Sequence, residues 1–90
     1  MTNASAPWYV YMVVCSDRTI YTGITLDVQK RIAEHNNGAI GAKYTRSRRP
    51  VSLAYQEELP DRSSASSREY QLKKLSRQQK LQLISTVTIK

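Results

Sequence analysis

The stretch 8–15 constrains the fold more than any other part of this sequence, because it is apolar on both of the faces that alternate along a strand. A strand in the middle of a sheet that is covered on both sides has this composition. The run is eight residues long, which is too short to cross a membrane. Ser16, Asp17 and Arg18 follow it and predict a tight turn. The sequence therefore predicts a central strand within a sheet that carries packing layers on both faces.

The residues after the turn predict the second strand of a hairpin. Residues 19–24 are β-branched and aromatic, and Gly23 lies where this strand would end. We assume a register in which Tyr21 faces Val13. Tyr11 then becomes the diagonal neighbour of Tyr21, about 7–8 Å away on the same face.

A helix and a third strand are expected next. Thr25 can cap a helix, Asp27 suits its positive end and Gly38 can close it, which predicts a helix over residues 26–37. Residues 51–58 read as a strand that ends before Pro60 and Asp61. Its apolar side is expected to hold Val51, Leu53 and Tyr55.

Two helices are expected to complete the chain, over residues 63–75 and after the capping-box pattern Ser76-x-x-Gln79. In the second helix Leu81 and Ile84 are expected to point inward. The expected fold is thus α/β, with a small three-stranded antiparallel sheet flanked by helices. One domain over residues 8–85 would lie between a flexible N-terminal tail, 1–7, and a C-terminal tail, 86–90.

The charge balance favours a phosphate-rich partner. Fourteen Lys and Arg against seven Asp and Glu give a formal net charge of +7, which favours nucleic acid, although a small basic protein can carry such charge without a specific partner. Cys15 and His35 are the only cysteine and histidine, which excludes an internal disulfide, a cysteine-rich zinc site and paired-histidine metal motifs. Because the N-terminus has no signal-peptide pattern, we expect a cytoplasmic protein with no membrane partner.

Two tyrosines, an arginine and a histidine form the first candidate group. Tyr11 and Tyr21 share one face of the hairpin, while Arg31 and His35 border the buried stripe of the first helix around Val28. Each could be an ordinary core aromatic or a solvated helix residue. Together they suit phosphoryl transfer, since cations beside a phenol lower its pKa below about 10 and Arg31 can stabilise phosphate charge.

Glu69 has two interpretations that spacing alone leaves equal. It lies four residues after Ala65 and three before Leu72, on the apolar side of its helix, where an unpaired carboxylate is costly. It could be a metal ligand. It could equally cap its own helix, because Ser66-x-x-Glu69 fits a capping box.

The segment before the third strand offers cations for a nucleic-acid backbone, with a tyrosine able to stack on a base. The expected nucleic-acid-binding residues are Lys43, Tyr44, Arg46, Arg48 and Arg49. The same run could be a solvated basic loop. A second basic stretch, formed by Lys73, Lys74, Arg77 and Lys80, is explained as well by solubility as by DNA.

The tripeptides Tyr9-Val10-Tyr11 and Tyr21-Thr22-Gly23, with Arg31, His35 and Glu69 after them, resemble the GIY-YIG nuclease family. This family includes the nuclease module of bacterial excision repair, homing endonucleases and small stand-alone bacterial proteins, and the chain is most similar to the last group. The similarity is highest in residues 8–11, 20–24, 41–45 and 73–77.

The resemblance implies a role for each site residue. Tyr11 would activate the water nucleophile, and Tyr21 would position phosphate or water. Arg31 would stabilise the phosphate, and His35 would bind phosphate or carry a proton. Glu69 would be the metal ligand, holding one Mg²⁺ or Mn²⁺ ion.

The sequence also departs from the family pattern. The first tripeptide lacks its leading glycine, Thr22 replaces an isoleucine, and no asparagine follows Asn37, although many nucleases of the family carry one beyond the metal glutamate. The expected function is metal-dependent endonuclease cleavage of nucleic acid, DNA before RNA, in repair or processing. The alternatives are a binding module of the same fold that cuts weakly or not at all, and a basic protein without catalytic history.

Overall fold

The computed structural model describes residues 7–37 and 48–88 and contains the expected three-stranded antiparallel sheet. Its strands are β1 (Trp8–Val14), β2 (Ile20–Thr25) and β3 (Ser52–Leu59), in the order β2-β1-β3. The run that is apolar on both faces is thus the central strand, as predicted. The order leaves β2 at an edge of the sheet.

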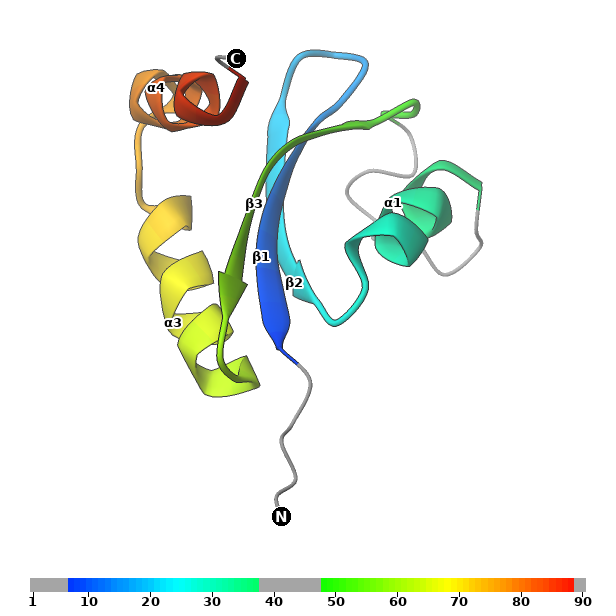
Figure 1. Cartoon of the computed structure of the whole chain (residues 1–90). Helices are drawn as coiled ribbons and strands as arrows, with labels where there is room; N and C mark the ends of the chain where they lie inside the picture. The colour runs from blue at the N-terminus through cyan, green and yellow to red at the C-terminus, as the bar shows by residue number, and fades with distance from the viewer. Residues whose placement is uncertain (1–6, 38–47, 89–90) are drawn as a thin grey trace.

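Helices cover both faces of the sheet (Figure 1). Helix α1 (Val28–Asn37) lies on one side, and α3 (Arg62–Lys73) and α4 (Arg77–Thr88) lie on the other. Helix α4 continues three residues past the expected end of the domain. None of the helices in the described part of the chain is long and apolar enough to cross a membrane.

Alternate residues of β1 enter two different hydrophobic clusters. Val10 and Met12 pack with Leu72 of α3 on one face. Tyr11 and Val13 pack on the other face, where α1 contributes Ile32. The buried members of the first cluster are apolar apart from the hydroxyl of Tyr55, whereas the second cluster contains Tyr11, the residue of which chemistry is expected.

The hairpin has the expected register, with Val13 facing Tyr21 and Tyr11 facing Gly23. The side chain of Asp17 accepts hydrogen bonds from the backbone N–H and the hydroxyl of Thr19, which tightens the turn. The register places Tyr11 and Tyr21 on one face, with their ring centroids 6.4 Å apart.

The prediction that Val51, Leu53 and Tyr55 share one side of β3 is wrong. Met12 pairs with Tyr55 and the next residue, Val13, pairs with Leu53, so β3 contains a one-residue bulge. A bulge reverses the alternation of side chains beyond it. Val51 therefore packs in the cluster of Tyr11, whereas Tyr55 packs in the cluster of Met12.

Helices α1 and α3 begin at residues other than those expected. Asp27 caps α1, since its carboxylate accepts the backbone N–H of Lys30, and the hydroxyl of Thr25 accepts the N–H of Asp27 one turn earlier. Asp61 caps α3 through the N–H of Ser64. The prediction that Thr25 caps the first helix was thus wrong.

The last helix begins as predicted, but its rotation about its own axis differs from the prediction, so different residues face the core. Ser76 and Gln79 form the reciprocal capping box, with bonds of 2.9 and 3.1 Å. Ile84 and Leu83 pack against the cluster of Met12. Leu81 is 43% exposed, so its predicted inward position was wrong.

Candidate active site

Tyr11 reaches the edge of the sheet because the residue beside it has no side chain. Gly23 is its partner on β2. A Cβ atom at Gly23 would lie 2.7 Å from Oη and 2.9 Å from Cζ of Tyr11, closer than packed carbon and oxygen atoms approach. The phenol therefore lies directly over the backbone of the edge strand, and Gly23 is the residue that permits it.

Tyr11 and His35 form a buried hydrogen-bonded pair. The Tyr11 hydroxyl lies 2.8 Å from Nε2 of His35, which comes from α1. Tyr11 is 1% exposed and His35 is fully buried. Tyr21 packs against both, with its ring centroid 5.4 Å from that of His35. Three of the predicted site residues thus meet at one place.

Burial dominates the acidity of Tyr11. It raises the pKa of the phenol to about 12, while Arg31 acts in the opposite direction through a hydrogen bond and its charge. The prediction that cations would bring this pKa below its usual value was therefore wrong in its net sign. A phenol with this pKa is protonated at neutral pH and can give up its proton only as it receives another.

His35 is the complementary partner in this pair. Burial, followed by the positive charge of Arg31, lowers the pKa of the imidazole from its ordinary value of 6.5, and Arg49 acts in the same direction. At neutral pH the ring is uncharged and can accept a proton from Tyr11 when its own proton is on Nδ1. The structure buries His35 more deeply than its expected place beside the helix stripe.

Arg31 joins the pair to the surface. It contributes a hydrogen bond to the Tyr11 phenol, and its Nη1 lies 3.0 Å from Oε1 of Glu34. The Arg31 side chain is 27% exposed, so a ligand can reach the guanidinium. Glu34 was not identified from the sequence, although its spacing three residues after Arg31 is that of a helical ion pair.

The charge of Glu69 acts on Tyr11 from the helix on the opposite face of the sheet. Glu69 lies on α3, which packs against β1 and β2, and its charge raises the pKa of Tyr11. The interpretation of Glu69 as a helix cap is wrong, because α3 begins at Arg62 and is capped by Asp61. Instead Glu69 pairs with Lys73 at 3.2 Å.

A divalent ion with most of its water retained would fit Glu69. Its carboxylate is 23% exposed and its partner Lys73 is 54% exposed, so Lys73 can move away at little cost. In the described part of the chain no group of three or more His, Cys, Asp or Glu could enclose a metal ion. The protein would thus supply one carboxylate ligand, as Mg²⁺ sites that use water and phosphate oxygens require.

Only some of the expected nucleic-acid-binding residues lie in the described part of the chain. Lys43, Tyr44 and Arg46 lie outside the described residues. Arg48 pairs with Asp17 of the β1–β2 turn at 2.9 Å, and Arg49 donates from Nε to the carbonyl oxygen of His35. These two arginines hold the chain before β3 against the hairpin and α1.

The side chain of Asn36 joins two elements of the site. Asn36 makes two hydrogen bonds with the backbone of Val51, one in each direction, at 2.7 and 3.1 Å. They fix the end of α1 against the start of β3. This contact was not predictable from the sequence, because an asparagine near a helix end commonly bonds to the backbone of its own helix.

In the second basic stretch, Lys74 lies over the ring of Tyr70 and Arg77 donates to the carbonyl of Arg18.

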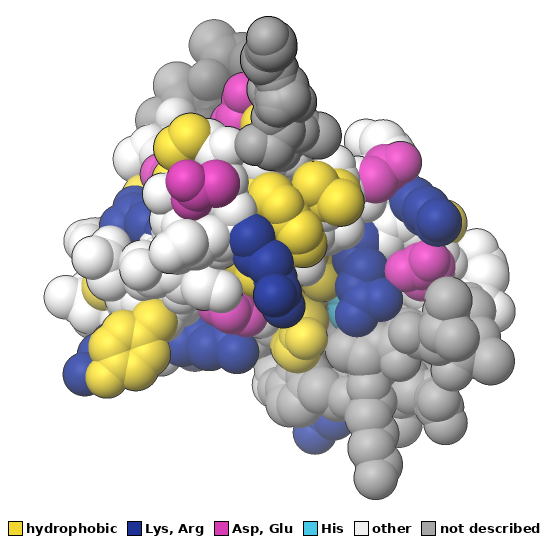
Figure 2. Space-filling model, turned by 90° about the horizontal axis from the view of Figure 1, so that it is seen from below, with side chains coloured by type: hydrophobic (Ala, Val, Ile, Leu, Met, Phe, Trp, Pro, Cys, Tyr) yellow, Lys and Arg dark blue, Asp and Glu magenta, His cyan; other side chains and the backbone are white. Residues whose placement is uncertain are grey.

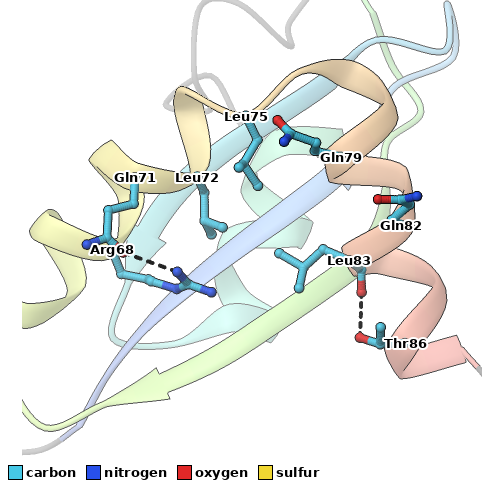
Figure 3. A pocket seen from close by; sticks show the side chains of 8 residues that line it. All are labelled: Arg68, Gln71, Leu72, Leu75, Gln79, Gln82, Leu83 and Thr86. Carbon is cyan, nitrogen blue, oxygen red and sulfur yellow. Dashed lines mark hydrogen bonds between the residues drawn. The ribbon is translucent and has the colours of Figure 1, made fainter.

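A groove of about 410 Å³ between α3 and α4 is lined by Arg68, Leu72 and Leu83 among others (Figure 3). It contains none of the predicted site residues.

Comparison with known proteins identifies the family of this chain. The family model described as GIY-YIG catalytic domain matches residues 7–82. A UPF0213 protein of Desulfotalea psychrophila is 57% identical over 77 residues, which is 86% of this chain and 70% of that protein. A UPF0213 protein of Clostridium perfringens is 56% identical over 82 residues, or 91% of this chain and 87% of its own length.

Two solved structures share the fold. The solution structure of a UPF0213 protein from Bacillus halodurans has a TM-score of 0.57 at 44% identity, covering 89% of this chain and 84% of that one. The solution structure of a protein from E. faecalis has a TM-score of 0.63 at 37% identity, covering 99% of this chain and 94% of that one.

Proposed function

The chain belongs to the GIY-YIG family, and from this premise we propose that it is a metal-dependent endonuclease that hydrolyses phosphodiester bonds in nucleic acid, DNA before RNA. The observation that carries the proposal is the buried Tyr11–His35 pair, on which Arg31 and Glu69 act from helices on opposite faces of the sheet. A core tyrosine does not need a neutral imidazole and a cation at its hydroxyl, with the charge of a carboxylate also acting on its pKa. The removal of a proton from water next to a phosphate does need them.

The pair provides a route for the proton. As water attacks phosphorus, its proton passes to the Tyr11 oxygen, while the proton of Tyr11 passes to Nε2 of His35. The P–O bond opposite the attacking water breaks, and the leaving oxygen takes a proton from solvent. The phenol remains neutral throughout and the imidazole gains the charge. This route avoids a free phenolate, which a pKa of about 12 makes scarce at neutral pH.

Arg31 binds the phosphate, and Tyr21 orients the imidazole of His35. The exposed part of the guanidinium can donate to two phosphate oxygens and stabilise the charge that develops on them. Glu34 holds the other part of Arg31 and so fixes its direction. Tyr21 packs edge-on against His35 and keeps the imidazole turned toward Tyr11.

Glu69 would hold the metal ion, Mg²⁺ or Mn²⁺, with Lys73 displaced. Once bound, such an ion would place positive charge beside the scissile phosphate and would lower the pKa of a water molecule bound to it. The protein's own residues then take the proton, bind the phosphate and keep bulk water from the buried pair.

A second function is favoured by the ion pair between Lys73 and Glu69. If this contact persists in solution with metal present, the site lacks its ligand and the protein is a nucleic-acid-binding module.

For the nuclease, we propose the cytoplasm as the compartment and DNA repair or processing as the role.

The test is incubation of the purified protein with supercoiled DNA, branched DNA and single-stranded RNA, each with Mg²⁺, Mn²⁺ or EDTA. We expect cleavage of DNA with either metal and none with EDTA. An Arg31→Lys variant keeps the charge but loses the paired donors, and should cut far more slowly. Binding without cleavage under every metal condition would favour the binding module.

A further inference from the structure

A groove of about 360 Å³ lies beside the candidate active site, at the end of the sheet where β1 begins and β2 ends. Trp8, Ile24 and Leu26 give it apolar walls, and Arg31 belongs to its lining. From this end of the molecule, hydrophobic side chains form a patch between Lys and Arg side chains (Figure 2). A ligand that reaches Arg31 can therefore place an apolar, flat group in contact with the patch.

The charges of the groove suit a neutral group. Its cations are Lys30 and Arg31, and its acids are Asp27 and Glu34. Asp27 caps α1 and Glu34 pairs with Arg31, so the two signs balance. A second phosphate would gain little here, whereas a nucleobase needs aromatic and apolar surface and few charges.

Two features of the apolar surface fit a base. Leu26 is 51% exposed although it is a large hydrophobic residue, and Trp8 offers the largest aromatic surface of any side chain. Arg62 lies over the Trp8 ring at 5.6 Å from its centroid but is not part of the groove lining. The groove thus meets indole surface that Arg62 does not cover.

We propose that this groove binds an unpaired nucleobase next to the phosphate held by Arg31, with Trp8 as the stacking residue. The inference rests on the proposed function and specifies its substrate as nucleic acid that is single-stranded at the site. A base within a duplex is already stacked on both faces and cannot enter the groove without being unpaired.

The chain offers a direct reporter, because Trp8 is its only tryptophan. We would titrate the protein with a single-stranded oligonucleotide in EDTA, and follow tryptophan fluorescence together with the anisotropy of a dye on the oligonucleotide. Stacking on a base should quench the tryptophan as the complex forms. A single strand with abasic positions throughout should bind through its phosphates without quenching, and a blunt duplex should quench far less than the single strand.

Substitution of Trp8 gives the second measurement. Base–aromatic stacking is worth about 1–3 kcal/mol, so Trp8→Leu should weaken single-strand binding by about 5- to 150-fold in Kd. Trp8→Phe should recover part of the loss. Tyr70→Leu is the matched control, because Tyr70 is an aromatic residue of α3 that is 63% exposed and outside the groove.

Saturated binding of the single strand without any change in fluorescence overturns the inference, and so does equal quenching by the duplex. These results do not depend on the folding of a variant. They are also separate from catalysis: quenching by single strands in a protein that never cuts DNA would support the groove and contradict the nuclease. If Trp8→Leu and Tyr70→Leu bind equally well, Trp8 is not the stacking residue.

Discussion

The two faces of strand β1 differ in what they bury. On one face Val10 and Met12 meet Leu72 in a cluster whose buried members, apart from the Tyr55 hydroxyl, are apolar. On the other face Tyr11 meets His35, and a hydrogen bond joins the two rings. Neighbouring residues of one strand thus serve different purposes.

The difference shows how a small domain can afford a buried polar pair. The cost of desolvating Tyr11 and His35 appears in their pKa values, raised for one and lowered for the other. The apolar face stabilises the strand from the other side by about 25 cal/mol for each Å² that it buries. Substitutions on the polar face should therefore affect chemistry first, and those on the apolar face stability first.

The largest effect is expected at Glu69, whose charge acts on Tyr11 of the polar face from across the sheet. Glu69→Gln should reduce cleavage by about 10³-fold or more, since a metal ion contributes several kcal/mol to transition-state stabilisation. The free energy of unfolding should change by less than about 1 kcal/mol, because the ion pair with Lys73 is partly exposed. Cleavage assays measure the rate, and denaturant melts measure the free energy of unfolding.

Lys73→Gln is the matched control for this prediction. It removes the same ion pair but leaves the carboxylate, so cleavage should remain at the wild-type level or rise at low Mg²⁺. A loss of cleavage equal to that of Glu69→Gln would mean that the ion pair, and not a metal, is what the site requires.

Gly23→Ala, a change on the polar face, should lower both stability and cleavage rate and so sharpen the comparison. The new Cβ would lie 2.7 Å from Oη of Tyr11, and Tyr11 is held in place by its bond to His35. We expect a stability loss of about 1–3 kcal/mol from overpacking and a rate loss of about 10²-fold from the displaced phenol. Wild-type rates in a folded Gly23→Ala protein would show that the position of Tyr11 is unimportant.

The polar face should also make stability depend on pH. Burial lowers the folded-state pKa of His35 below 6.5, so the unfolded chain takes up a proton first as pH falls. The contribution is complete above about pH 6.5 and is lost toward the folded-state pKa, at up to about 1.4 kcal/mol per pH unit. Melts between about pH 7.5 and 5.5 should show this slope in wild type and a smaller slope in His35→Gln.

The smallest effect is expected at Thr22, which neighbours Gly23 but pairs with Met12 on the apolar face. Among the described residues, its hydroxyl is the buried side-chain group without a hydrogen-bond partner. Thr22→Val should stabilise the protein by up to about 1 kcal/mol, or about 4–8 °C in Tm. Cleavage should not change, and a destabilised variant would mean that the hydroxyl has a role on this face.

Local signals predicted the elements of the fold, whereas their relative rotation needed tertiary contacts. The apolar run of β1 and the turn at Asp17 were enough to predict the hairpin, whereas its register was an assumption that the structure confirms. The bulge that separates Val51 from Tyr55 was not predictable, because it depends on how β3 pairs with β1. Leu81 and Leu83 are both apolar, and only the packing of α4 chooses between them.

The sequence predicted that Tyr11 and His35 lie together, but not the electrostatics of the pair. Residue types and spacing suggested Tyr11, Arg31 and His35, whereas the choice of Glu69 as a metal ligand rested on the family resemblance, because spacing left its two interpretations equal. The sign of the pKa shift at Tyr11 was not predictable, since it depends on how far burial outweighs the Arg31 charge. The groove beside Trp8 also needed the fold, because residues from both ends of the hairpin and from α1 form it.

Tyr11→Phe compared with Met12→Ala tests the separation of the two faces most directly, with cleavage rate and free energy of unfolding measured for both. We expect Tyr11→Phe to lose about 10²–10⁴-fold in rate and only about 1–2 kcal/mol in stability, from the unsatisfied His35 nitrogen. Met12→Ala should lose about 2–5 kcal/mol in stability and keep the wild-type rate per folded molecule. The separation of the two faces would be contradicted by a Tyr11→Phe protein that cuts as fast as wild type. It would also be contradicted by a Met12→Ala protein that loses as much rate per folded molecule as Tyr11→Phe.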